Sequence, residues 1–224
     1  MRISKFATSI LIFMAVSVIF AAPASAIDVA LDLPSTIVRI EVSDGTESYF
    51  DTKLTKVPSG YDVTNVTYHG WCVDRRTEMI RSPATHMVLL LSSLNPKGEF
   101  ANKAWDLVNY ILNHKQGSVQ DIQQAIWYVI EDGNYIPTSP TAWTIINDTI
   151  ENGNGFVPAQ GGIVAVICYP TFMFPNQGTV QISIIEVETT PVVPEFPSAF
   201  VLTPIMLTIL LAILVYTKRR KILR

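Results

Sequence analysis

Alternation of apolar and polar residues predicts β-strands in the outer parts of the central region of this chain. In residues 35–42, Val38, Ile40 and Val42 would share one face of a strand. Three further strands are predicted: residues 61–74 from their aromatic and β-branched content, residues 163–169 from a continuous apolar run, and residues 180–187 from renewed alternation. The run IVAVICY is typical of a buried strand.

The middle of the chain has helical periodicity instead. Apolar residues three to four positions apart predict a helix over residues 101–114 and a second helix beginning at Val119. Ser118 and Asp121 form a capping-box pattern at the start of the second helix, and Gly133 suits a left-handed cap at its end. A third short helix is predicted over residues 141–152.

Strands on both sides of a helical insertion predict an α+β fold. We expect an antiparallel β-sandwich or barrel-like subdomain with a small helical subdomain inserted into it. Residues 27–188 would form this ectodomain, which is long enough for one domain with its own hydrophobic core.

The two ends of the chain have the pattern of a secreted and anchored protein. A basic start, an apolar run and small residues before position 27 predict a signal peptide over residues 1–26, with an N-terminal membrane anchor as the alternative. Residues 198–217 are apolar and long enough for a transmembrane helix, and the basic tail, residues 218–224, should remain cytoplasmic. The predicted protein is single-pass, type I, with its body on the extracellular face of the membrane.

A Pro-rich linker, residues 189–197, connects the ectodomain to this segment. Its run VPEFPS, followed by an apolar span and a basic end, resembles the PEF-type C-terminal sorting signals of archaeal surface proteins. The resemblance implies an archaeal origin and cleavage by an archaeosortase-type enzyme, which would leave the protein anchored to a lipid. The alternative is a stiff lead-in to a permanent membrane helix.

Charge and motif content exclude several classes of function. All 19 acidic residues fall within residues 27–197 with 9 of the 16 basic ones, a formal charge of 9 − 19 = −10. Phosphate backbones repel such a surface, so we expect no nucleic-acid partner. The three histidines are scattered and no metal-ligand or phosphate-loop motif is present, so the sequence predicts no metal and no cofactor.

Two residues suggest a stored reactive bond. Cys72 lies in WCVD at the end of a predicted strand, and Gln123 lies in a predicted helix beside Ala125 and Trp127. A cysteine thiolate held against a glutamine carboxamide can expel ammonia and leave an internal thioester, provided that apolar neighbours exclude water. Trp71 and Trp127 are candidate shields.

WCVD followed by IQQAIWYVIEDG resembles the thioester (TQXA) domains of bacterial surface adhesins. Cys72 matches the thioester cysteine, Gln123 the thioester glutamine, and Ala125 and Trp127 later positions of the helix motif. Ile122 stands where the family has Thr, and Trp71 where Tyr is common. The resemblance implies a β-rich subdomain with a helical one, and covalent attachment to an amine on a partner surface protein or envelope component, with Asp74 as an adjacent candidate base.

Three alternatives remain open. Outside the cell, a disulfide between Cys72 and Cys168 is the default expectation for two cysteines. A second possibility is an inert envelope module of the same fold with free thiols, serving structure or reversible adhesion. A turnover enzyme would need Cys72 as nucleophile with His69 or His86 as its base, but we expect a binder that reacts once at most.

Overall fold

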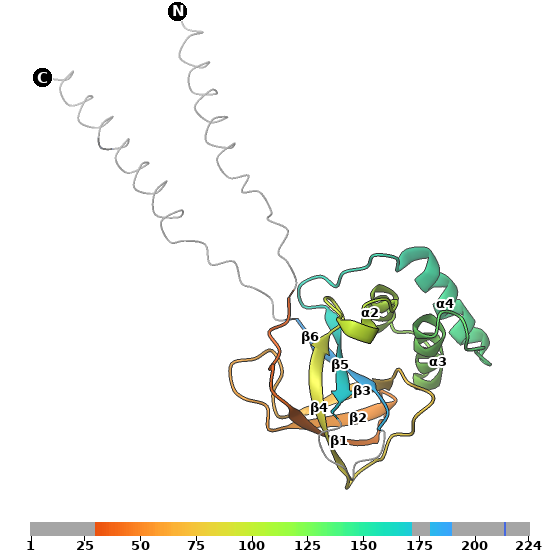
Figure 1. Cartoon of the computed structure of the whole chain (residues 1–224). Coiled ribbons are helices and arrows are strands. Elements are labelled where there is room, and N and C mark those ends of the chain that lie inside the picture. Colours follow the sequence, from red (N-terminus) through yellow and green to blue (C-terminus); the bar gives the residue numbers. More distant parts are fainter. Residues whose placement is uncertain (1–29, 172–179, 190–212, 214–224) are drawn as a thin grey trace, which may run out of the picture.

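In the part of the chain that the structure describes, six strands close into an antiparallel barrel, and the helices α2, α3 and α4 pack together on one side of it (Figure 1). The computed structural model describes residues 30–171, 180–189 and 213. The strands are β1 (Val38–Asp44), β2 (Phe50–Thr55), β3 (Thr67–Cys72), β4 (Thr85–Ser92), β5 (Ile163–Pro170) and β6 (Ser183–Glu188). Between β4 and β5 come the 3-10 turn η1 (Gly98–Phe100) and the helices α2 (Trp105–Asn113), α3 (Val119–Ile130) and α4 (Pro140–Asn152).

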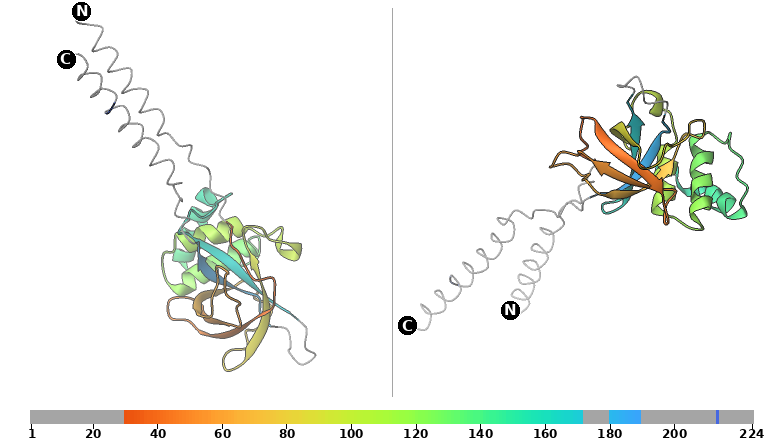
Figure 2. Two further views of the ribbon diagram at one scale, coloured as in Figure 1. Left: turned by 90° about the vertical axis from the view of Figure 1, so that its left-hand side faces the viewer. Right: turned by 90° about the horizontal axis from the view of Figure 1, so that it is seen from below.

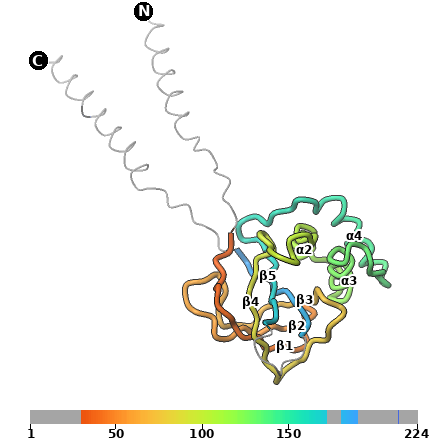
Figure 3. The backbone as a smooth tube through the Cα atoms, viewed as in Figure 1, coloured from red at the N-terminus to blue at the C-terminus, as the bar shows by residue number. Residues whose placement is uncertain are grey.

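The barrel order is β1-β2-β3-β6-β5-β4, with every neighbouring pair antiparallel. The helical insertion leaves the barrel after β4 and returns in β5, which pairs with β4, so the insertion does not interrupt the barrel (Figure 3). The views in Figure 2 also show the helices gathered beside the barrel. The predicted α+β architecture, with a barrel and an inserted helical subdomain, is confirmed.

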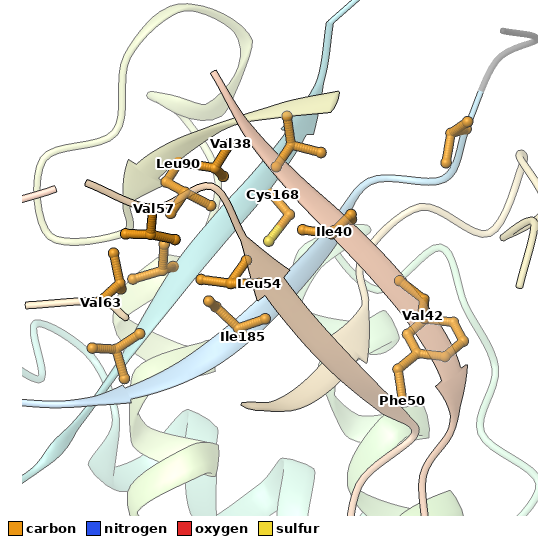
Figure 4. Packing of buried hydrophobic residues seen from close by; sticks show 14 of the residues in the cluster. Val38, Ile40, Val42, Phe50, Leu54, Val57, Val63, Leu90, Cys168 and Ile185 are labelled. Atoms are coloured by element: carbon orange, nitrogen blue, oxygen red, sulfur yellow. The ribbon is translucent and has the colours of Figure 1, made fainter. Parts of the chain in front are cut away.

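Two hydrophobic clusters meet at the wall formed by β3, β6 and β5. Alternate residues of these strands point into the barrel, where Cys168 and Ile185 pack with apolar residues of β1 and β2 (Figure 4). Cys72 belongs to the same cluster. The intervening residues point outward and pack beneath the helices: Trp71, Ala165, Ile167 and Ile184. The wall is therefore buried on both faces, which explains the uninterrupted apolar run in β5.

Most predicted elements are present, with shorter bounds. The interior face of β1 consists of the three residues expected, and Ser118 and Asp121 form the predicted capping box of α3. Gly133 adopts the expected positive φ of 78°. The strand predicted over residues 61–74 is wrong in its first half, because β3 begins only at Thr67, and the first predicted helix begins at Trp105.

The strands β2 and β4 were missed because each places a polar side chain inside the barrel. Thr52 of β2 and His86 of β4 are buried among apolar residues, which weakens the apolar–polar alternation.

The predicted signal peptide, transmembrane helix and basic tail lie outside the described residues, apart from Ile213, and so does the linker beyond Thr189. Within the part of the chain that the structure describes, no helix is long and apolar enough to cross a membrane.

Candidate functional site

The carboxamide of Gln123 occupies the place of a missing strand residue beside Cys72. The β2–β3 ladder ends at the pair Phe50–Gly70, so Cys72, the last residue of β3, has a strand neighbour only in β6. Its N–H donates to Gln123 Oε1 at 2.9 Å, and its C=O accepts from Gln123 Nε2 at 2.8 Å. The N–H and the C=O of Cys72 both point toward the β2 side, because the two main-chain groups of one residue in an antiparallel ladder point toward the same neighbouring strand.

The position of Gln123 follows from the packing of α3. Ile122, Ala125 and Ile126 of this helix are buried in the cluster between the helices and the barrel wall. Gln123 is itself fully buried, with 0% of its surface exposed. Burying a carboxamide without partners would cost about 1–3 kcal/mol, and the two bonds to Cys72 offset this cost. The structure therefore brings together the two residues that the motif singled out.

The sulfur of Cys72 has two polar contacts. The indole N–H of Trp127 donates to Sγ at 3.3 Å, and the thiol donates to the main-chain carbonyl of Asp74 at 3.3 Å. Trp127 follows Gln123 by four residues, so both side chains lie on the face of α3 that is directed at the end of β3. One helix thus supplies a group to each side of the Cys72 residue: a carboxamide to its backbone and a donor to its sulfur.

A cluster of aromatic rings and one guanidinium group holds the indole in place. Tyr49 and Tyr135 meet Trp127 edge-on, with ring centroids 5.7 Å and 5.4 Å away. The guanidinium of Arg75 lies 4.3 Å from the centroid of Tyr135 and 5.6 Å from that of Trp127, and it also bonds Glu131 at 3.3 Å. This cluster is an ordered cover over the sulfur.

Two cavities border the cover from the outside. A cavity of about 370 Å³ is lined by Tyr49, Arg75 and Trp127 among others, and one of about 310 Å³ lies on the opposite side of Arg75, toward η1. Neither is lined by Cys72 or Gln123. The cover therefore lies between these cavities and the Cys72 sulfur.

Burial raises the pKa of the Cys72 thiol to about 11. The hydrogen bond from the Trp127 indole N–H acts in the opposite direction and lowers this pKa in part, because it stabilises the thiolate. At neutral pH the buried sulfur is a protonated thiol.

Two of the predicted supporting residues have other roles. Trp71 does not shield the sulfur: as the neighbour of Cys72 on a strand it points to the other face, beneath the helices. Its indole N–H donates to Glu186 at 2.7 Å, and Glu186 also binds Lys115 at 2.7 Å. The carboxylate of Asp74 accepts the backbone N–H of Arg76 at 2.9 Å, so Asp74 meets the sulfur only through its main-chain carbonyl.

Gln124, the second glutamine of the motif, is structural. Its carboxamide is buried, and Oε1 accepts the backbone N–H of Thr138 at 2.7 Å and the hydroxyl of the same residue at 3.2 Å. It fastens the loop that carries Tyr135 to α3. Ala125, which is fully buried, has no polar group and allows close packing.

Both cysteines are free thiols in the structure, so the alternative of a Cys72–Cys168 disulfide is wrong. Cys72 and Cys168 each pair with Ser183, which lies between them on β6. Two strand spacings separate their Cα atoms by roughly 9–10 Å, beyond the limit of about 7 Å for a disulfide. Figure 4 shows the Cys168 side chain among apolar residues of the barrel interior.

Neither histidine considered as a base contacts the sulfur. His69 lies on the outer face of β3 near Glu47, at 3.8 Å, and His86 is buried in β4 with Nε2 2.6 Å from the carbonyl oxygen of Ile80. Among the described residues, no group of three or more His, Cys, Asp or Glu side chains is placed to hold a metal ion.

Comparison with known proteins gives a weak structural similarity. No protein-family model and no curated protein matches the sequence. The N-terminal thioester domain of a surface protein from Clostridium perfringens has a TM-score of 0.44 at 11% identity, covering 67% of this chain and 98% of that one. The N-terminal thioester domain of a protein F2 like fibronectin-binding protein from Streptococcus pneumoniae has a TM-score of 0.41 at 10% identity, covering 71% and 98%.

Proposed function

We propose that this chain is a secreted, membrane-anchored surface protein in which Cys72 and Gln123 form an internal thioester. The thioester would attach the protein covalently to an amine on a partner surface protein or envelope component. The single observation that carries the proposal is the pair of hydrogen bonds between the Gln123 carboxamide and the Cys72 backbone, next to a sulfur that accepts the Trp127 N–H.

The proposed bond would form directly from the unreacted pair. The sulfur of Cys72 attacks Cδ of Gln123, the C–S bond forms, the C–N bond breaks, and ammonia leaves with the thiol proton. The Cys72 N–H is 2.9 Å from Oε1, within the range in which a donor stabilises the oxyanion of a tetrahedral intermediate. Rigid placement of both residues replaces a bimolecular encounter by a local one.

Attachment is the second step. The nitrogen of a partner amine attacks the same carbon, an amide bond forms, and the C–S bond breaks. Sulfur leaves as a thiolate that the Trp127 N–H stabilises, and it then takes up the proton released by the amine. The reaction ends there, because the amide is stable, so the protein is a binder that reacts once rather than an enzyme. It needs no cofactor.

A second candidate function is an inert envelope module. It is favoured by the two hydrogen bonds between the carboxamide and the Cys72 backbone and by the raised pKa of the thiol, since both stabilise the unreacted pair. In that case Gln123 would serve only to fasten α3 to β3.

Intact mass spectrometry of the purified full chain separates the two. The thioester predicts a mass lower by one ammonia than the sequence requires, a loss that Cys72→Ala and Gln123→Ala both abolish. Methylamine should then add its full mass and expose one thiol to alkylation. Gln124→Ala serves as the matched control, because it removes the neighbouring carboxamide and should leave the ammonia loss in place. An unmodified mass in the wild-type chain would establish the inert module.

A further inference from the structure

The sequence contains two Asn-X-Thr motifs, in which an exported protein can receive a glycan on the asparagine. One motif, NVT at residues 65–67, lies between β2 and the start of β3, and the other, NDT at residues 147–149, lies within α4. Both asparagines are exposed at the surface. The structure nevertheless separates the two motifs, because the two asparagine carboxamides differ in what they bind.

The carboxamide of Asn65 binds the main chain of Val57 at two points. Its Oδ1 accepts the Val57 N–H at 2.9 Å, and its Nδ2 donates to the Val57 carbonyl at 3.1 Å. Because both bonds go to one residue, the hydrogen that Nδ2 donates is the one on the same side of the C–N bond as Oδ1. Val57 is buried, so loss of this contact would leave two main-chain groups without their partner.

A glycan at Asn65 would remove this donor. The sugar carbon replaces one hydrogen of Nδ2, and the resulting secondary amide strongly prefers the trans form. In the trans form the substituent lies on the side of Oδ1, which is the place of the donated hydrogen, and the remaining hydrogen points away from Val57. The folded chain therefore cannot keep the Val57 contact and carry a glycan at Asn65 at the same time.

At Asn147 there is no such conflict. Its side chain is exposed, and among the described residues its carboxamide has no hydrogen-bond partner. Asn147 lies on the outer face of α4, opposite the face that packs on α2 and α3. That packed face carries the buried residues of the helix: Ala142, Ile145, Ile146 and Thr149. A substituent on Nδ2 of Asn147 would extend into solvent.

Exposed apolar side chains flank Asn147 along α4. Trp143 lies four residues before it and Ile150 three residues after it, and both are exposed. Residues three and four apart are neighbours on a helix surface. The C–H faces of a sugar ring can pack on aromatic and aliphatic side chains, so a glycan on Asn147 would cover part of this apolar surface.

We infer that Asn147 is a site of N-linked glycosylation and that Asn65 keeps its free carboxamide. The inference rests on the secretion in the proposed function, but not on the thioester. The donor is an oligosaccharide joined through its C1 to a lipid phosphate, which the exporting cell supplies with its transferase. The bond from C1 to the phosphate oxygen breaks, the bond from C1 to Nδ2 forms, and the proton that Nδ2 loses passes to the released lipid phosphate.

The transfer must take place before α4 folds. The motif requires the hydroxyl residue two positions after the asparagine. Thr149 is almost fully buried in the folded protein, and its Oγ1 donates to the Ile145 carbonyl at 2.7 Å. The glycan is therefore added during export, and the outer face of α4 then accommodates it without a change in packing.

The full chain, secreted by a host with Asn-X-Thr glycosylation, tests the site. Peptide mapping by mass spectrometry, after enzymatic release of the glycan in heavy-oxygen water, converts each modified asparagine into a labelled aspartate. We expect the label at Asn147 and not at Asn65. Asn147→Gln should abolish glycosylation. Thr67→Val is the matched control, because it destroys the other motif but retains the Asn65 carboxamide, and it should leave the glycan in place.

The opposite results separate the possible errors. An exported wild-type chain without a glycan on Asn147 would overturn the site, and a folded protein with a glycan on Asn65 would overturn the exclusion of that residue. A chain that is not exported would overturn the proposed secretion and the site together. Absence of the ammonia loss in the same sample would overturn only the thioester.

A stability measurement on unglycosylated protein tests the physical basis of the distinction. Asn65→Gln displaces the carboxamide from Val57 and should lower the melting temperature by about 2–4 °C, the effect of roughly one net hydrogen bond. Asn147→Gln should melt with the wild type. Equal melting temperatures for Asn65→Gln and the wild type would contradict the role given to the Val57 contact.

Discussion

Replacing Trp127 by phenylalanine tests whether the indole N–H assists the proposed reaction or whether the ring only covers the Cys72 sulfur. Phenylalanine can keep the edge-on contacts with Tyr49 and Tyr135 but has no N–H to donate to the Cys72 sulfur. A hydrogen bond to a charged group contributes about 1.5–3 kcal/mol, and the lower end applies here because sulfur is a weak acceptor.

This magnitude fixes two expected results. The thiolate would lose about 1.5 kcal/mol of stabilisation, so the pKa of Cys72 should rise by about one from its already raised value near 11. The departing sulfur carries part of that charge in the transition state, so attack by ethylamine should become roughly three- to tenfold slower.

Both quantities are measurable on the full chain. The pKa comes from the pH dependence of Cys72 alkylation after the thioester has been opened with ethylamine, with the modified cysteine identified by peptide mapping. Trp143→Phe is the matched control, because Trp143 meets Tyr128 edge-on and is not part of the cover over the sulfur. An unchanged or lowered pKa in Trp127→Phe, with an unchanged aminolysis rate, would refute the role of the indole N–H.

Three further outcomes are expected. Gln124→Leu removes the acceptor for the Thr138 N–H and should lower the free energy of unfolding by about 1–3 kcal/mol in urea titrations, with no effect on ammonia loss. Trp71→Phe removes the hydrogen bond to Glu186 and should lower the free energy of unfolding by a similar amount, with no change in the rate of the reaction with methylamine. If Trp71 were a shield, its replacement would instead expose the thioester to water. In Gln123→Ala the Cys72 thiol stays free, and its pKa in the folded protein lies above the usual 9.0. The free energy of unfolding should therefore be retained below pH 9 and fall by about 2–3 kcal/mol as the pH rises from 9 toward 11. The same fall in Cys72→Ser/Gln123→Ala would contradict this origin.

The parts of the site that could be predicted are those carried by regular elements. Helical periodicity placed Gln123 and Trp127 on one helix, and the pattern around Cys72 placed it at a strand end. The mistake about Trp71 came from treating sequence neighbours as spatial neighbours, although adjacent residues of a strand point to opposite faces. The alternation of β3 would have been sufficient to separate Trp71 from Cys72.

The cover could not be predicted, because its other members come from segments without periodicity. Tyr49 precedes a strand that was missed, Arg75 lies in the turn after β3, and Tyr135 lies in the loop after α3. One local indication existed. Gly133 lies just after α3, where the loop that carries Tyr135 begins, and the buried Gln124 in the middle of α3 binds the far side of that loop at Thr138. Only the closed barrel shows that these three segments meet at Trp127.

The end of a ladder inside a closed barrel is a favourable place for the proposed thioester. The pairing of β3 with β6 fixes the position of Cys72 on one side. Because the barrel is closed, β3 cannot shift toward α3. The Gln123 carboxamide must therefore come to Cys72, and it does so through the hydrogen bonds that a strand residue would make. Consequently the same contacts can stabilise the unreacted fold and position the carbon for attack, and whether the bond forms depends on how far the Trp127 N–H offsets the cost of a buried thiolate.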